Sequence, residues 1–258
     1  MPRFAANLSF LFNEVPFPDR FTAAAEQGFT ACEFMFPYDY EAASLRQRLD
    51  VNGLRLVLFN AAQGNWEAGE RGIAAVPGRE AEFDAAILQA AAYARVLGNK
   101  MVHVMAGLET QGASRSMFLA NLRRGADLVA GDGLTLIIEP INTRDMPGYF
   151  LNRTAQALDI LADVGRANAG LQFDLYHRHI MDGDVEAGLR EAKAVIRHMQ
   201  IASPPDRGEP DKGELDFKRL FDVIDRSGYG GYIGLEYKPR AGTVPGLSWA
   251  KALGVRFS

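Results

Sequence analysis

Three carboxylates and one amide occupy similar places in four apolar segments of the second half of the chain. They are Glu139, Asp174, Gln200 and Glu236, and each ends or interrupts a short run of β-forming side chains. An oxygen-rich set of this kind suits Mg²⁺ or Mn²⁺ and leaves coordination positions for substrate and water. Without a cation, converging carboxylates would repel one another and take up protons. If the fold brings these segments together, the residues predict a divalent metal site.

Ordinary structural roles are the alternative for each of these residues. A single acid at the end of a strand can cap a helix or pair with a surface base, but four such residues in four consecutive segments weaken that interpretation. Gln200 is the least certain ligand, because its amide could donate a hydrogen bond instead. Zinc would favour more histidine or cysteine.

The four histidines receive different interpretations. His177 follows Asp174 by three residues, so its imidazole could hold a substrate oxygen or orient a carboxylate. A loop histidine bonded to the backbone is the alternative. We expect His103 and His198, which lie inside apolar segments, to be core residues with satisfied hydrogen bonds, and His179 to be exposed.

Strand-like runs alternate with helical segments along the whole chain, the pattern of repeated βα units. The helical segments with the most regular periodicity cover residues 19–27, 79–97, 116–130 and 154–164, with Gly28, Gly98, Gly131 and Gly165 as expected C-terminal stops. The predicted strands cover residues 4–8, 31–36, 54–60, 101–106, 134–139, 170–174, 198–202 and 232–236.

Eight such units in 258 residues predict an α/β protein with a single (β/α)8 barrel over residues 1–258. An open doubly wound sheet is the alternative, but no Gly-x-Gly-x-x-Gly follows the first strand. In a barrel the carboxyl ends of the strands meet at one face, which would bring the four oxygen ligands together. The glycine-rich connection 61–78 follows a predicted strand, so we expect a lid at that face.

Composition excludes several classes of protein. The net charge is −4 and the basic residues are scattered, which disfavours nucleic acid as a partner. Charged residues or glycine interrupt every apolar stretch, so no membrane association is expected. The single Cys32 lies in an apolar run and is expected to be buried. With no secretory signal visible at the first residues, we expect a cytoplasmic protein.

Several segments resemble the hydroxypyruvate isomerase family, which belongs to the xylose isomerase-like barrels and includes the closely related 2-oxo-tetronate isomerases. The resemblance covers nearly the whole chain, and its most specific segments are 69–74 and 236–240. The chain departs from the family after the third predicted strand, where residues 60–65 lack a usual Pro and Asp. The resembling segments are 4–9, 33–39, 68–74 with 77–80, 138–142 and 234–240.

This resemblance implies site roles for particular residues. Glu139 and Glu236 would be the paired proton donor and acceptor, and Glu139, Asp174, Gln200 and Glu236 would hold Mg²⁺ or Mn²⁺. In related sugar epimerases, residues at the positions of His177 and Arg207 contact substrate, so both are expected to do so here.

The expected reaction interconverts hydroxypyruvate and tartronate semialdehyde through an enediolate, with a small hydroxy-keto acid as substrate. Arg71 in the lid would pair with the substrate carboxylate, unless it forms a salt bridge that fastens the lid. The alternatives are a 2-oxo-tetronate isomerase, a ketose epimerase, an endonuclease IV-like metal phosphodiesterase and a non-enzymatic sugar-acid binding module. The sequence leaves the metal, the preferred acid and a homo-oligomeric state open.

Overall fold

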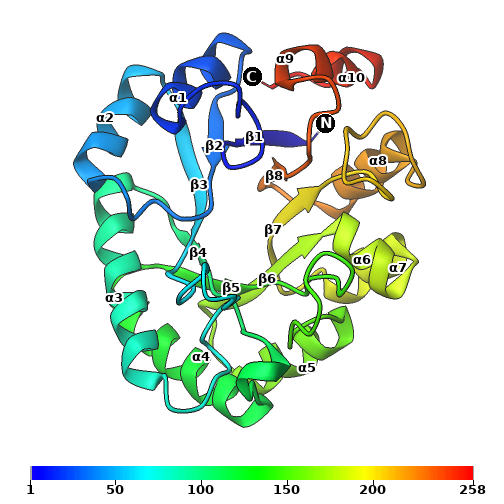
Figure 1. The fold of residues 1–258 in the computed structure, drawn as a ribbon. Coiled ribbons are helices and arrows are strands. Elements are labelled where there is room, and N and C mark those ends of the chain that lie inside the picture. Colours follow the sequence, from blue (N-terminus) through cyan, green and yellow to red (C-terminus); the bar gives the residue numbers. More distant parts are fainter. Residues whose placement is uncertain (1, 258) are drawn as a thin grey trace.

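Eight parallel strands close into a barrel in chain order, with β1 paired to β8 (Figure 1). The computed structural model describes residues 2–257. The predicted barrel is therefore confirmed, and all eight predicted strands are found, with ends that differ by up to three residues. The strands are β1 (Arg3–Asn7), β2 (Ala31–Glu33), β3 (Arg55–Asn60), β4 (Met101–His103), β5 (Thr135–Ile138), β6 (Ala169–Asp174), β7 (Ile196–Ile201) and β8 (Tyr232–Leu235).

Helices surround the barrel on its outer side (Figure 1). The four predicted helices are found within two residues of their expected ends, and the bounds of α5 are as predicted. The helices are α1 (Phe17–Glu26), α2 (Ala42–Val51), α3 (Glu80–Leu97), α4 (Arg115–Val129), α5 (Thr154–Val164), α6 (Leu175–Asp182), α7 (Val185–Ala192), α8 (Phe217–Ser227), α9 (Thr243–Gly246) and α10 (Ser248–Ala252), with short 3-10 turns η1 (Glu109–Gln111) and η2 (Ala130–Asp132).

Glycine stops are confirmed for two of these helices and wrong for another. Gly98 and Gly165 cap α3 and α5 in the left-handed conformation, where a side chain would be strained. Gly131 does not end α4, because the chain continues from Val129 into η2. The left-handed cap falls on Gly133, two residues later, at φ 63°.

The loop between β3 and α3 runs from residue 61 to residue 79 and is held to the barrel at Gly72. Gly72 has φ 111° and pairs with Ala106, and an added Cβ would lie 2.4 Å from the carbonyl oxygen of Met105. Arg79 pairs with Glu70 and with Glu82 at 2.6 Å each. The salt bridge that fastens this loop is therefore made by Arg79 and not by Arg71.

Buried polar side chains replace apolar ones toward the carboxyl ends of the strands. The larger hydrophobic cluster packs between the barrel and its helices, and Cys32 is buried as predicted. No helix within residues 2–257 is long and apolar enough to cross a membrane. The buried polar residues on or directly after the strands are Asn7, Glu33, Asn60, His103, Glu139, Gln172, Asp174, His198, Gln200 and Glu236.

Candidate active site

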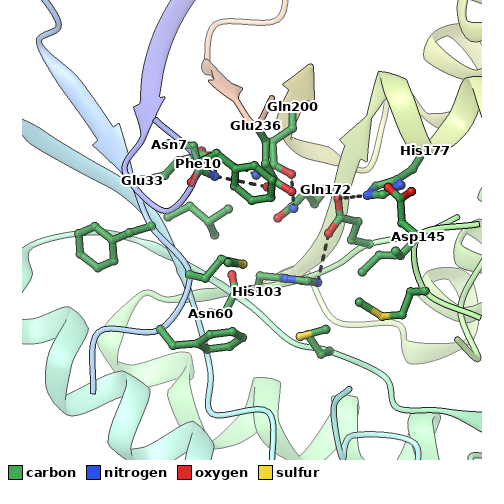
Figure 2. A pocket seen from close by; sticks show the side chains of 18 of the residues that line it. Asn7, Phe10, Glu33, Asn60, His103, Asp145, Gln172, His177, Gln200 and Glu236 are labelled. Carbon is green, nitrogen blue, oxygen red and sulfur yellow. Dashed lines mark hydrogen bonds and ion pairs between the residues drawn. The ribbon is translucent and has the colours of Figure 1, made fainter. Parts of the chain in front are cut away.

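A cavity of about 390 Å³ opens at the carboxyl ends of the strands. Every strand, or the residue directly after it, contributes one polar side chain to the lining, and Figure 2 shows most of these side chains turned toward a common space. This convergence is what a barrel imposes on strand-end residues. In order from β1 to β8, the polar residues are Asn7, Glu33, Asn60, His103, Glu139, Gln172, Gln200 and Glu236.

Glu139 and Asp174 bring two unpartnered carboxylate oxygens together. Oε1 of Glu139 and Oδ2 of Asp174 are buried without hydrogen-bond partners, and ligand atoms of both residues and of His177 lie within 4.8 Å of one another. The other oxygen of Asp174 caps α6 by accepting from the backbone nitrogen of Tyr176 at 2.7 Å. Asp174 therefore has the helix-capping role considered above and still keeps one oxygen free. The two free carboxylate oxygens could bind a metal ion.

The acids of the site have raised pKa values. Burial raises the pKa of Glu139 well above its ordinary value, and the carboxylates of Glu236 and Asp174 raise it further. Burial also raises the pKa of Asp174 to about 6 and that of Glu236 to about 8, although the Arg207 guanidinium lowers both. Bound positive charge would favour the ionised forms of these acids.

Glu236 is held from two sides. The guanidinium of Arg207 bonds to its Oε1, and the side-chain amide of Asn7 donates to its Oε2 at 3.3 Å. Arg207 also pairs with Asp145 at 3.3 Å and lies over the ring of Phe10. The structure thus places Arg207 in the cavity, in contact with a predicted catalytic acid.

Gln200 has a fixed amide orientation. Its Nε2 donates to Glu33 at 2.7 Å, and its Oε1 accepts from Nε2 of Gln172 at 2.5 Å. A carbonyl oxygen carries two lone pairs, so one remains for another partner. The amide is therefore a donor through nitrogen, and its oxygen is still able to act as a ligand.

His177 is oriented by Asn142. The backbone nitrogen of Asn142 donates to its Nδ1 at 3.2 Å, and the side-chain amide lies 2.6 Å from the same atom. Since a backbone N–H only donates, the neutral ring must carry its hydrogen on Nε2, which lies 3.8 Å from Asp174 and 4.0 Å from Glu139. Burial lowers the pKa of His177, with further lowering by Arg207 and His103. As placed, His177 is a hydrogen-bond donor rather than a metal ligand.

The interpretation of His103 as a satisfied core residue is wrong. Its ring is 2% exposed, yet it lines the cavity, and its Nε2 has no partner and lies 3.8 Å from Oε2 of Glu139. Burial, together with nearby His198, lowers the pKa of His103 to about 3. Apolar neighbours in sequence do not reveal which face of the barrel a strand residue occupies.

The structure also shows the surroundings of the other two histidines, His198 and His179. His198 is a buried residue whose Nε2 bonds to Glu33 at 2.6 Å, which confirms its core position. Its Nδ1 has no partner. His179 is half-buried and pairs with Glu214 at 2.7 Å, so the expectation of an exposed side chain is wrong.

Arg71 lies at the mouth of the cavity. Its Nη1 donates to the carbonyl oxygens of Trp66 and Glu70, and its guanidinium stacks on the indole of Trp66 at 3.7 Å. Among residues 2–257 the structure shows no carboxylate paired with it. Contact with a substrate carboxylate stays a prediction.

Sequence reasoning missed the site residues of the first half of the barrel. Asn7, Glu33 and Asn60 end β1, β2 and β3, and His103 ends β4. They carry the same signal that identified the acids of the second half. For Glu33 and His103 this strand-end position was missed, because the predicted strands 31–36 and 101–106 were each three residues too long and placed both residues in strand interiors.

A family model described as xylose isomerase-like TIM barrel matches residues 21–253. The chain belongs to this family. It is similar to the 2-oxo-tetronate isomerase of Cupriavidus necator, with 56% identity over 97% of this chain and 98% of the relative. It is also similar to the hydroxypyruvate isomerase of Escherichia coli, with 45% identity over 96% and 98%.

One solved structure superposes closely on this chain. It is named AP endonuclease, family 2, from Brucella melitensis, and it matches with a TM-score of 0.95 and 47% identity, covering 98% of this chain and 99% of that one. These comparisons confirm the resemblance to the hydroxypyruvate isomerase family. They support the conclusion that the protein is an isomerase.

Proposed function

We propose that this isomerase moves a proton between adjacent carbons of a short hydroxy-keto acid and interconverts hydroxypyruvate and tartronate semialdehyde. The observation that carries the proposal is the pair Glu139 and Glu236, two buried acids with raised pKa values in one cavity after β5 and β8. Relatives of 43–56% identity named hydroxypyruvate isomerase or 2-oxo-tetronate isomerase support this substrate class.

The two glutamates supply the proton transfer. Because the Glu236 carboxylate raises the pKa of Glu139, the pair favours one ionised and one protonated member. The ionised member takes the proton from the carbon that bears the hydroxyl, and the protonated member returns one to the carbonyl carbon. The two roles exchange in the reverse direction. Arg207 keeps Glu236 oriented throughout.

Glu139, Asp174, Gln200 and Glu236 would hold Mg²⁺ or Mn²⁺ in this proposal. The free oxygens of Glu139 and Asp174 and the open lone pair on Gln200 fit a hard cation, and the raised pKa values fit a site completed by positive charge. When bound, the ion supplies Lewis-acid stabilisation of negative charge on the two adjacent substrate oxygens.

The remaining cavity residues would bind the substrate. His177 offers an N–H donor, Arg207 a partly buried guanidinium, and Arg71, at the mouth, a guanidinium that no carboxylate of residues 2–257 pairs with. We propose that Arg71 takes the carboxylate of the acid, because a guanidinium offers two parallel donors. This contact would favour keto acids over neutral ketoses.

A four-carbon acid is the second candidate. The relative from Cupriavidus necator, at 56% identity, is named 2-oxo-tetronate isomerase, and a cavity of about 390 Å³ holds either acid. The same proton transfer between the second and third carbons would convert a 2-oxo acid into its 3-oxo isomer. Epimerisation of a ketose uses the same pair of glutamates and is a third outcome to test.

A nuclease activity has less support, although the structure from Brucella melitensis bears that name. The net charge of −4 provides little attraction for a phosphate backbone. The described residues hold one group able to bind a metal, and it contains a single histidine. We therefore propose no nucleic-acid partner and no membrane partner. We propose a cytoplasmic location, with which the buried free thiol of Cys32 is compatible.

Proton NMR in D2O tests the proposal directly. Hydroxypyruvate, 2-oxo-tetronate and a neutral ketose are incubated with the protein, first with a chelator and then with added Mg²⁺ or Mn²⁺. Metal-dependent conversion of either acid is expected, with little conversion of the ketose. Preferred turnover of the ketose, or cleavage of abasic DNA with no change in either acid, would refute the proposal.

A further inference from the structure

We propose that His103 is a further catalytic residue, which moves the proton between the two substrate oxygens. The inference rests on the proposed isomerisation and adds a step that Glu139 and Glu236 do not perform. It assigns the imidazole at the end of β4 to direct contact with the substrate.

The reaction requires two protons to change places. The carbon proton leaves the hydroxyl-bearing carbon and arrives at the former carbonyl carbon, which is the work of the two glutamates. The hydroxyl proton must also leave its oxygen, because that carbon becomes the carbonyl. A proton must reach the other oxygen, which becomes the hydroxyl. No proton or electron is gained or lost overall.

The geometry places His103 where it can move the proton between the two substrate oxygens. Its Nε2 is 3.8 Å from Oε2 of Glu139, which is too long for a hydrogen bond but leaves both groups facing the same part of the cavity. Figure 2 shows the ring directed into the pocket. A substrate carbon within reach of Glu139 would carry its oxygen within reach of His103.

The unpartnered nitrogen points to a ligand. Buried polar atoms without partners are uncommon, and His103 Nε2 is one of a few in the described chain. Two other unpartnered buried atoms, Oε1 of Glu139 and Oε1 of Gln172, belong to residues that line the same cavity. The missing partners therefore cluster where the substrate would bind.

A neutral imidazole suits a transfer between oxygens. A neutral imidazole carries one N–H, whose proton can be given to one substrate oxygen and replaced from the other. Nε2–H gives its proton to the oxygen that becomes a hydroxyl, and Nε2, left as a transient imidazolate, recovers the proton of the oxygen that becomes a carbonyl, so that the ring ends neutral. A neutral histidine polarises the carbonyl in a comparable way in triosephosphate isomerase.

His177 is less suited to this step. Its Nε2 lies close to Asp174 as well as Glu139, so its hydrogen already faces two carboxylates. Oε2 of Glu139 lies near His103 and Oε1 near His177. The two rings thus approach Glu139 at different oxygens.

The test compares His103→Gln with wild type in D2O, with the metal bound. Two rates are measured by NMR, deuterium uptake into remaining substrate and product formation. We expect product formation to fall by about 10²-fold, the lower range for lost acid–base catalysis, while deuterium uptake falls less. His179→Gln, outside the cavity, is the matched control and should keep both rates. Metal affinity, measured by calorimetry, should be unchanged in both variants.

Three outcomes would overturn the inference. Equal loss of both rates would make His103 a structural residue, and a loss of metal affinity would make it a ligand. In the wild type, the Nε2 resonance of ¹⁵N-labelled His103 should shift when substrate is added, and an unchanged resonance would exclude contact even if the variant misfolds. Wild type that converts neither acid would instead refute the proposed function itself.

Discussion

Gln200 donates a hydrogen bond from its amide nitrogen to a carboxylate oxygen of Glu33, 2.7 Å away. Glu33 is buried and also accepts from Asn7 at 2.9 Å and bonds to His198 at 2.6 Å. Because this carboxylate oxygen accepts from the nitrogen of Gln200, the amide oxygen is turned to the other side. A residue on β2 thus decides which atom of a β7 residue is available to a cation.

Replacing Glu33 with Gln should weaken metal binding. The new amide can donate as well as accept, so Gln200 would lose its single orientation. Residues that orient ligands typically contribute about 10–100-fold in metal affinity, and a loss in this range is expected by calorimetry. Glu26→Gln, at an exposed position on α1, is the matched control. Unchanged affinity in Glu33→Gln would show that Gln200 is not a ligand.

Replacing Glu139 or Glu236 with Gln should stop isomerisation, since an amide cannot take or return a proton. A fall of about 10³-fold or more in kcat is expected from the usual range for general acid–base catalysis. Metal binding should persist in part, because the other oxygen ligands remain. Near-normal turnover by either variant would remove that glutamate from the mechanism.

The metal-free protein should become less stable as pH rises from about 7 to 8, a window above the ordinary pKa of histidine, where the lowered pKa values of His103 and His177 no longer oppose the effect of the acids. In unfolded chains Asp and Glu have pKa values of about 4, whereas folding raises the pKa of Asp174 to about 6 and of Glu236 to about 8. The folded state therefore binds more protons in this window, and the free energy of unfolding falls as pH rises.

Bound cation should reverse this trend. Because protons compete for the carboxylates, Mg²⁺ or Mn²⁺ should raise Tm more at pH 8 than at pH 5.5. Thermal melts with chelator and with metal at pH 5.5, 7 and 8 measure both effects. A metal-induced rise in Tm that is larger at pH 5.5 would contradict the assignment of these acids as ligands.

Removing the guanidinium of Arg71 should impair binding of acid substrates. Arg71→Ala is expected to raise KM about 10-fold with a smaller change in kcat, which corresponds to roughly 1.4 kcal/mol of lost binding. Arg79→Ala serves as the comparison, because Arg79 fastens the same loop through Glu70 and Glu82. Equal effects of the two substitutions would assign Arg71 a structural role.

Adding a methyl group at Gly72 should displace the loop. Its φ of 111° and the 2.4 Å approach to Met105 leave no room for Cβ. Gly72→Ala is expected to lower the free energy of unfolding by about 1–3 kcal/mol, the usual range for such backbone strain, and urea titration measures it. Gly69 also has a positive φ, but a Cβ added there would meet no neighbouring atom. Gly69→Ala should therefore lower the free energy of unfolding by less than Gly72→Ala does. Equal stability of Gly72→Ala and wild type would contradict this account.

Local sequence determined the repeated architecture and part of the site. Alternating strand-like and helical segments predicted eight parallel strands, because parallel pairing needs a crossover after every strand. The same pattern placed Glu139, Gln200 and Glu236 at or near the ends of β5, β7 and β8, where they line the cavity, and it placed Asp174 at the end of β6. The spacing of hydrophobic residues and the presence of a polar residue at the end of an apolar run both depend on residues that are close in sequence. Both patterns can therefore be recognised without the structure.

Tertiary structure alone decided how these side chains face one another. The positions of Glu33 and His103 at strand ends could not be predicted from the sequence. The ends of β2 and β4 are set by pairing with neighbouring strands, which local sequence does not show. The orientation of the Gln200 amide depends on a residue 167 positions away, and that of the His177 ring on one 35 positions away. Hydrogen bonds over such separations arise from barrel closure, which local sequence preferences do not encode.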